Sequence, residues 1–270
     1  MRVSNHENIE ATLKRVASLG QKFPEAKELL DFLKELIIYR NSVSAKLSEM
    51  EFDINQNEKP IFRISKLNCE KYIPYLKELT EILQEKGTEE IRNEAEKIHG
   101  KNPEEIKTLV IDTLHKKIEN DVVRMIIYAW IQAILFPISK QIYVSEHEWF
   151  KPYCPVCGNL PFTSYISDTE EGEGIRFLKC SVCLNEWIYG RTQCVKCGNV
   201  EDPTLNYYIP EEYGYIEIQV CGKCNHYIKI FDKRKDGFVI PEVDDVATVT
   251  LDLWATEQGF KKVERNLLGL

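Results

Sequence analysis

The chain has 270 residues, of which 43% are hydrophobic and 29% are charged, and its formal net charge is −8. This composition is that of an ordinary globular protein long enough for two cores. The negative charge argues against a general nucleic-acid binder, which needs a basic surface to meet phosphate. The start, Met1 to Glu7, lacks the apolar core of a signal peptide, so we expect a cytoplasmic protein with reduced thiols.

Residues 1–149 show the apolar spacing of helices, and they are expected to form an all-helical domain. Pro24 is expected to open a helix with one apolar side, formed by Leu29, Leu33, Leu36, Ile37, Val43 and Leu47. A second helix is predicted from Pro74 to about Gly87, and Thr88 is predicted to cap a short helix after it. Cys69 is expected to be a small buried side chain of this half.

Asn102, Pro103 and Glu105 together form a helix start, which predicts a long apolar helix after them. Pro137 is expected to end or kink that helix. Its most apolar stretch, Val122–Ile138, is interrupted by Arg124 and is short for a bilayer. We therefore expect a buried helix and no stable membrane insertion.

From about residue 150 the composition changes to Gly, Pro, Tyr and Cys, and short strand-like runs replace the helical spacing. The predicted strands are Thr163–Ile166, Ile175–Leu178, Trp187–Tyr189, Leu205–Ile209, Ile216–Val220 and Tyr227–Phe231. A final helix is predicted from Asp244 to Gln258, with Asp244 as its N-cap. The predicted fold class is therefore α+β.

Four Cys-x-x-Cys pairs, here called knuckles, lie in this second half. They are Cys154/Cys157, Cys180/Cys183, Cys194/Cys197 and Cys221/Cys224. The loop between the first two knuckles holds 22 residues, and the loop between the last two holds 23. The first and third knuckles are both followed by Gly-Asn. Two such units, one after the other, predict two four-thiolate metal sites.

We pair the first two knuckles at one site and the last two at the other, because each unit then closes a short loop. An interleaved pairing remains an alternative. Iron and zinc both accept four thiolates, so the spacing leaves the metal open. A glycine after the second Cys supplies the positive φ that such a turn needs, as Gly158 and Gly198 do, whereas Leu184 fits less comfortably.

The expected architecture has an all-helical domain at 1–149, a first four-cysteine metal module at 150–191, and a second four-cysteine metal module with a C-terminal helix at 192–270. His226 could compete as a ligand, although an ordinary loop histidine is the preferred interpretation. Trp187 and Tyr227 are expected to belong to the hairpin core. The acidic run Asp168–Glu173 is interpreted as a solvated loop, with a basic peptide partner as the alternative.

The chain resembles the FdhE-type formate dehydrogenase accessory proteins over about Pro152 to Phe260, and in outline before that at Pro60-Ile61-Phe62-Arg63. The motifs that carry the resemblance are Cys154-Pro155-Val156-Cys157-Gly158, Arg176-Phe177-Leu178-Lys179-Cys180-Ser181-Val182-Cys183, Glu186-Trp187, Lys196-Cys197-Gly198, Cys221-Gly222-Lys223-Cys224, Tyr227-Ile228-Lys229, Asp244-Asp245-Val246-Ala247-Thr248, Leu251-Asp252-Leu253 and Glu257-Gln258-Gly259-Phe260. The resemblance implies two tandem rubredoxin-like or zinc-ribbon modules after a helical domain. It also implies a cytoplasmic role in maturing formate dehydrogenase through contact with its catalytic subunit.

The leading hypothesis is a non-enzymatic maturation factor that binds two metal ions, iron or zinc, and recognises a protein. Four thiolates leave no open coordination position for a substrate, which favours a structural or binding role over hydrolysis. The alternatives are a rubredoxin-like electron carrier or redox sensor, and a zinc-ribbon nucleic-acid binder. The segment Lys151–Lys235 has 10 Lys or Arg against 11 Asp or Glu, a poor match to phosphate. Homo-oligomerisation is left open.

Overall fold

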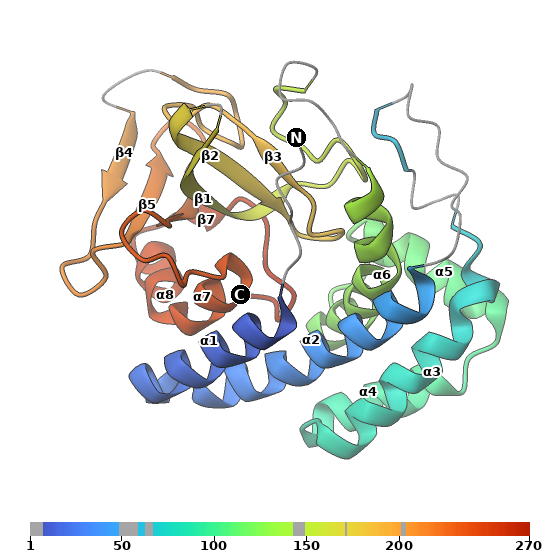
Figure 1. The fold of residues 1–270 in the computed structure, drawn as a ribbon. Helices are drawn as coiled ribbons and strands as arrows, with labels where there is room; N and C mark the ends of the chain where they lie inside the picture. The colour runs from blue at the N-terminus through green and yellow to red at the C-terminus, as the bar shows by residue number, and fades with distance from the viewer. Residues whose placement is uncertain (1–7, 49–58, 63–66, 143–148, 171, 201–203) are drawn as a thin grey trace.

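The computed structural model describes residues 8–48, 59–62, 67–142, 149–170, 172–200 and 204–270. Within these described residues, seven strands form one sheet, and helices pack below and beside it (Figure 1). The predicted mixed architecture is confirmed, with a helical N-terminal part and two cysteine clusters in the C-terminal part.

The helical part contains six α-helices among the described residues. They are α1 (Ile9–Lys22), α2 (Lys27–Leu47, preceded by a 3₁₀ turn at Pro24–Ala26), α3 (Cys69–Lys86), α4 (Glu89–His99), α5 (Pro103–Leu114) and α6 (Asp121–Gln141). The expected helix starts at Pro24 and Asn102 are confirmed, and Asn102 forms a full capping box with Glu105. The Thr88 side chain caps α4 by accepting a hydrogen bond from the backbone N–H of Ile91.

Three details of this half differ from expectation. Helix α3 begins at Cys69 and carries Pro74 inside it, because Asn68 takes the N-cap position five residues earlier than predicted. The predicted long helix is two helices, α5 and α6, and the Asn120 side chain caps α6 by accepting from the N–H of Val123. Pro137 does not end α6, which continues to Gln141.

Helix α6 is the central element of the main hydrophobic core, and most of its side chains are buried. By length and hydropathy it is the one candidate membrane span among the described residues, but 94% of that apolar window is buried inside the protein. The expectation of a buried helix is therefore confirmed. Cys69 is also buried, as predicted.

All six predicted strands are present. The strands are β1 (Pro161–Thr169), β2 (Gly172–Cys180), β3 (Glu186–Ile188), β4 (Leu205–Tyr208), β5 (Ile216–Cys221), β6 (His226–Asp232) and a short β7 (Lys261–Lys262) that was not expected. Their order in the sheet is β3-β2-β1-β6-β5-β4, and β7 pairs with β6. Since β1 pairs in parallel with β6, at Ser164 opposite Ile230, the two cysteine modules share one continuous sheet. The predicted module boundary at residue 192 stays a prediction.

The C-terminal helix prediction needs correction. Two helices, α7 (Pro241–Ala247) and α8 (Val249–Glu257), meet at Thr248, and the N-cap of α7 is Ile240. Asp244 is buried inside α7 and forms an ion pair with Arg15 of α1. The Nζ of buried Lys229 donates to the carbonyl oxygens of Asp245 and Thr248, which supplies partners for the buried C-terminal end of α7.

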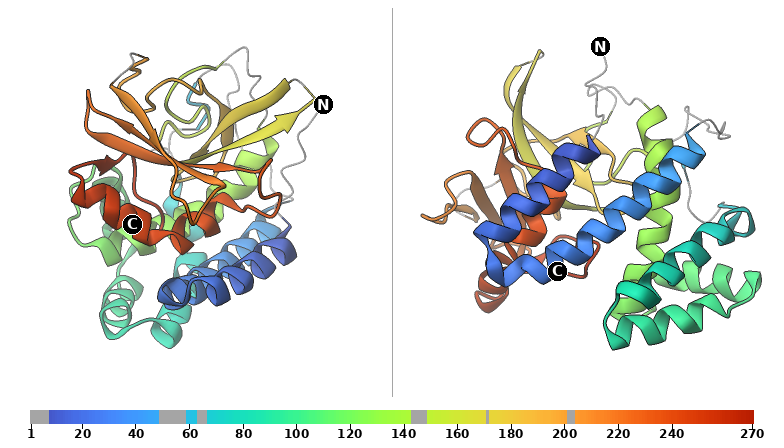
Figure 2. Two further views of the ribbon diagram at one scale, coloured as in Figure 1. Left: turned by 90° about the vertical axis from the view of Figure 1, so that its left-hand side faces the viewer. Right: turned by 60° about the horizontal axis from the view of Figure 1, so that its bottom comes forward.

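Helix α7 links the sheet to the helical half (Figure 2). Each of its acidic residues forms an ion pair with a buried Lys or Arg side chain of another element. Glu242 pairs with α2, Asp244 with α1, and Asp245 with β6 and β7. Ionic contacts buried this deeply fix how the elements dock, because an unpaired partner would be costly.

Candidate metal centres

The eight cysteines gather into two groups of four, with the sequential pairing that was predicted. The first centre consists of Cys154, Cys157, Cys180 and Cys183, and the second centre consists of Cys194, Cys197, Cys221 and Cys224. Within each centre the four sulfurs lie within 4.8 Å of one another. The interleaved alternative is excluded by this arrangement. That the eight residues ligate metal stays a prediction.

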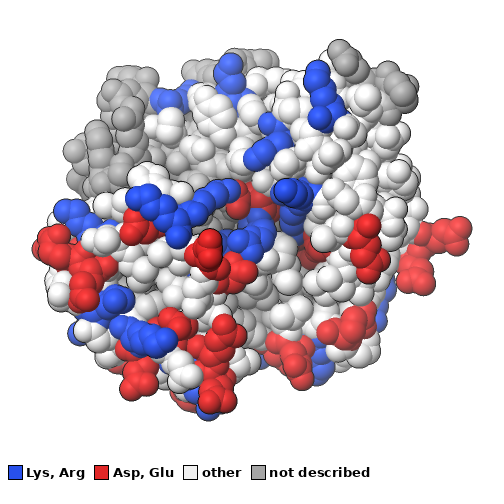
Figure 3. All heavy atoms as spheres, turned by 180° about the vertical axis from the view of Figure 1, so that it is seen from behind, with Lys and Arg blue, Asp and Glu red and all other residues white. Residues whose placement is uncertain are grey.

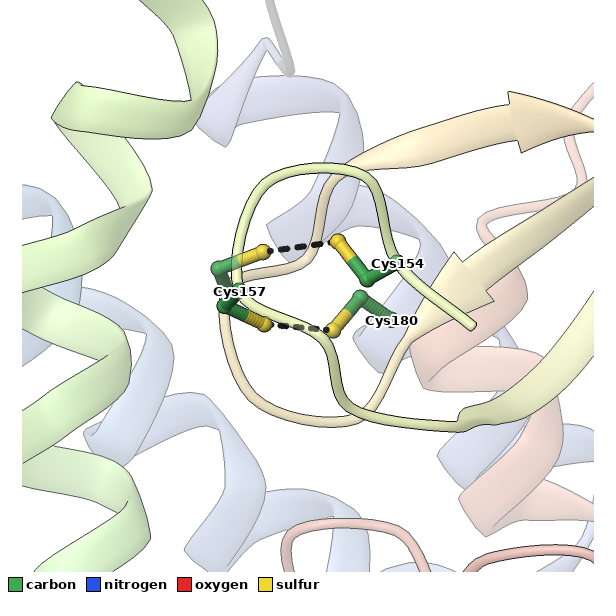
Figure 4. A group of neighbouring side chains, drawn as sticks. Cys154, Cys157 and Cys180 are labelled. Atoms are coloured by element: carbon green, nitrogen blue, oxygen red, sulfur yellow. Dashed lines mark hydrogen bonds between the residues drawn. The ribbon is translucent and has the colours of Figure 1, made fainter. Parts of the chain in front are cut away.

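In the first centre, a knuckle before β1 faces a knuckle after β2 (Figure 4). The sulfurs of Cys154 and Cys183 are 3.5 Å apart, and those of Cys157 and Cys180 are 3.4 Å apart. In the second centre, the sulfurs of Cys194 and Cys224 are 3.7 Å apart. A tetrahedral ion with bonds of roughly 2.3 Å to sulfur needs sulfurs about 3.8 Å apart. The spacing of both centres therefore fits a single ion.

The knuckle turns close in the way a tetrathiolate site needs. The residue after the second Cys has a positive φ in all four knuckles: Gly158, Leu184, Gly198 and Asn225. Leu184 was expected to fit poorly, yet it takes φ 60° like the others. Its buried side chain packs with Phe136 and Phe162, which offsets the cost of the left-handed backbone. The N–H groups of Val156 and Val182 point at the sulfurs of Cys154 and Cys180, each at 3.4 Å.

The thiols of the first centre do not behave as ordinary buried side chains. Burial, the largest influence, raises the pKa of Cys154 and of Cys183 well above the usual value. Burial also opposes ionisation of Cys157, but hydrogen bonds from the other three thiols outweigh it and hold the pKa of Cys157 well below the usual value. The protons of the other three thiols therefore favour the ionised form of Cys157. A cation replaces those protons and stabilises all four sulfurs as thiolates, so the donor set fits a metal.

The first centre is built into the main core. All four of its cysteines are buried in the cluster that contains α6. Gln132 of α6 donates its Nε2 to the carbonyl of Ser181 at 3.0 Å, and Ser139 donates its hydroxyl to the carbonyl of Cys183 at 3.0 Å. Two residues of the helical half therefore hold the second knuckle in place.

A segment from the helical half also covers the first knuckle. The N–H of Ile61 donates to the carbonyl of Pro155 at 3.0 Å, and the N–H of Phe62 donates to that of Val156 at 2.7 Å. A Cβ added to Gly158 would lie 3.2 Å from Pro60, so this segment packs tightly over the turn. We call residues Pro60, Ile61 and Phe62 the covering segment. In the sequence, these residues were part of the family resemblance, and no local pattern indicated that they would lie at the first centre.

The second centre is more open. Cys197 is exposed and Cys224 is half-buried, whereas Cys194 and Cys221 are buried. A Cβ added to Gly198 would lie 3.6 Å from the side chain of Gln193, which is its nearest described neighbour. Gly158, at the same place in the first centre, has Pro60 of the covering segment as its neighbour. The second centre therefore lies at the protein surface, at the end of the sheet that carries β4 and β5.

The other residues singled out in the sequence have structural roles outside the two centres. His226 is not among the residues grouped at the second centre, and its Nδ1 lies 2.6 Å from the carbonyl of Cys224. Trp187 and Tyr227 are buried in the core, as predicted. The described residues of the acidic run Asp168–Glu173 form the β1–β2 hairpin turn, in which Asp168 accepts a hydrogen bond from the N–H of Gly174 at 2.7 Å.

Two family models match the second half of the chain. The model described as "FdhE, central domain" matches residues 153–191, and the one described as "FdhE, C-terminal domain" matches residues 192–268. These two matches meet between the two cysteine centres, so each contains one complete centre.

Curated relatives match along almost the whole chain. A protein of Aquifex aeolicus named "Protein FdhE homolog" is 43% identical over 100% of this chain and 98% of the relative. One from Haemophilus influenzae (strain PittEE) with the same name is 27% identical over 96% of this chain and 87% of the relative. The crystal structure of the FdhE protein from Pseudomonas aeruginosa has the same fold, with a TM-score of 0.75 over 96% of this chain and 95% of that chain, at 20% identity.

Proposed function

Because the chain belongs to the FdhE family, we propose that it is a non-enzymatic accessory protein for the maturation or assembly of formate dehydrogenase. It acts by binding the catalytic subunit of that enzyme in the cytoplasm, without stable insertion into a membrane. The family name and the resemblance described above support the link to formate dehydrogenase.

The observation that carries the proposal is the donor set of the two centres. Each contains four cysteines and no other candidate ligand among the described residues. With four thiolates around one ion, no coordination position is left for a substrate. Such a centre supports a fold and does not hydrolyse a bound molecule. Either zinc or iron suits this donor set, and each supplies a cation that holds four thiolates together.

Metal binding gives the sheet its rigidity. Most of the strands begin or end at a knuckle, so each ion would clamp two strand ends together. The two modules share one sheet through β1 and β6, and the first is also held by α6. Two bound ions would therefore hold the strands of the shared sheet in fixed positions and make its surface rigid.

The surface we propose for docking lies beside the second centre. Exposed apolar side chains occur there on β4, which is the last strand of the sheet, and on α8. We define the docking surface as the exposed side chains of Tyr208 on β4 and Leu253 on α8. The ring of Tyr208 lies 5.1 Å from that of Trp254, which brings β4 and α8 together. Exposed aromatic and aliphatic groups of this kind are typical anchors of protein interfaces.

The charge distribution favours a protein partner over nucleic acid. On the face shown in Figure 3, Lys and Arg side chains lie next to Asp and Glu over the lower half. The whole chain has 43 acidic residues against 35 Lys and Arg. Phosphate recognition needs a surface with clear positive excess, which this balance does not provide.

Co-purification with a tagged formate dehydrogenase catalytic subunit tests the proposal. The wild-type chain is expected to bind, and Leu253→Glu is expected to weaken binding at least tenfold, because Leu253 is 60% exposed in the docking surface. Ile38→Glu is the matched control, since Ile38 is 39% exposed on α2 in the helical half. No binding of the wild type to the subunit, with or without its cofactors, would rule out the proposed function.

A further inference from the structure

The two centres differ in how far each is covered, although their knuckles repeat. Cys157 and Cys197 occupy the same place in the repeat, and both are followed by Gly-Asn. Cys157 is 7% exposed, whereas Cys197 is exposed to solvent. Two cysteines at matching positions of the repeat thus differ in their exposure to solvent.

The covering segment is one feature that only the first centre has among the described residues. Its two backbone N–H groups bind the carbonyls of Pro155 and Val156 in the first knuckle. The corresponding residues of the third knuckle are Val195 and Lys196, and no backbone N–H among the described residues donates to their carbonyls. Nothing described in the structure takes the place of the covering segment at the second centre.

The first centre also has neighbours that restrain its opening. Ser139 and Gln132 bind backbone carbonyls of the second knuckle, and all four sulfurs lie inside the main core. In the second centre, the buried cluster holds Cys194, Leu205 and Cys221, with Cys224 partly buried at its edge. Moving the cysteines of the second centre apart therefore disrupts many fewer buried contacts than moving those of the first centre apart.

We propose that the second centre is the exchangeable centre of the protein and that Cys197 is its point of access to competing ligands. A soft competitor, such as a thiolate chelator, would take the place of the Cys197 sulfur at an ion held by the four cysteines of the second centre. The first centre would keep its ion, because its four cysteines are buried in the main core and the covering segment packs over its first knuckle. This inference rests on the proposed occupancy of both centres by metal.

The test uses the full chain loaded with zinc. Elemental analysis first establishes two ions per chain; a lower content would count against metal occupancy itself and not against the difference between the centres. An excess of a coloured zinc chelator is then added. We expect release in two phases of one ion each, with the second phase at least tenfold slower. A single phase with both ions released at one rate would overturn the inference.

Alkylation assigns the phases to the centres. After the fast phase, brief treatment with N-ethylmaleimide and peptide mass spectrometry should find Cys197 modified and Cys157 protected. Modification of Cys157 at the same rate as Cys197 would contradict the proposal. This measurement uses the wild-type chain and does not depend on whether a cysteine variant folds.

A pair of variants tests the covering segment. Phe62→Pro removes the N–H that donates to Val156, so the slow phase should accelerate at least fivefold while the fast phase is unchanged. Phe62→Leu keeps that N–H and should leave both phases as they are. An unchanged slow phase in Phe62→Pro would show that the covering segment does not protect the first centre.

Discussion

Arg40 of α2 and Glu242 of α7 form a two-pronged ion pair that is buried on both sides. Nη1 of Arg40 lies 3.0 Å from Oε2 of Glu242, and Nη2 lies 2.7 Å from Oε1. The two side chains are only 3% and 5% exposed. This pair joins the helical half to the C-terminal helices across 202 positions of sequence.

Glu242→Ala is expected to lower the free energy of unfolding by about 3–5 kcal/mol, because it removes the carboxylate that accepts from both Nη atoms of the buried Arg40 guanidinium. Urea denaturation at pH 7 measures the change. The double variant Arg40→Met with Glu242→Leu should recover most of the loss, since it removes both charges. A Glu242→Ala protein within about 1 kcal/mol of wild type would contradict the role of this pair.

Gln132→Leu is expected to lower the free energy of unfolding by about 1–3 kcal/mol, because it leaves the buried carbonyl of Ser181 without its donor. Gln141→Leu is the matched control, since Gln141 is exposed at the end of the same helix. Thermal and urea unfolding of both variants measure the difference. Equal stabilities for the two would show that α6 does not support the second knuckle through this bond.

Leu184→Gly and Asn225→Gly test how the knuckles tolerate a positive φ. Both residues have φ near 60°, but Leu184 is buried and Asn225 is exposed. Leu184→Gly should cost about 2–4 kcal/mol, because the lost packing against Phe136 and Phe162 exceeds the relief of strain. Asn225→Gly should stay within about 1 kcal/mol of wild type. A stabilised Leu184→Gly protein would contradict the packing argument.

Asp232 is expected to make stability dependent on acid pH. Hydrogen bonds from the Arg234 side chain, with smaller contributions from its backbone and charge, lower the pKa of Asp232 in the folded chain. A depressed folded pKa contributes stability that is present above the unfolded pKa of about 3.9 and is lost as pH falls through the folded value. The difference in unfolding free energy between wild type and Asp232→Asn should therefore be constant above about pH 5 and shrink below about pH 4. A difference that does not vary from pH 7 to pH 3 would contradict this linkage.

Much of the second half could be predicted from sequence. The two repeated units of knuckles predicted which four sulfurs lie together in each centre. The short strand-like runs beside the knuckles predicted β1 to β6. Local signals also placed the caps at Thr88 and Asn102, because a cap depends only on residues within one turn.

What could not be predicted depends on distant partners. Asp244 has the appearance of an N-cap, but its partner Arg15 lies 229 positions away. The parallel pairing of β1 with β6 likewise leaves no local trace, and the covering segment reaches the first knuckle from the helical half. Each of these contacts is set by the packed fold, which sequence spacing alone does not contain.

The two cysteine centres should also differ in how much structure they support. Cys154→Ser should expose α6 to rapid hydrogen exchange, because the first centre lies in the core that α6 dominates. Cys194→Ser should leave α6 protected and loosen only β4 and β5. Hydrogen exchange followed by mass spectrometry measures both. Equal protection of α6 in the two variants would contradict the division.

Elemental analysis of the freshly purified chain, combined with its absorption spectrum, tests the central claim most directly. Two clamped ions per chain are expected, with thiolate charge-transfer bands in the visible range if the metal is ferric iron and a colourless protein if it is zinc. Less than one ion per chain, together with eight freely titratable thiols in the folded protein, would contradict it.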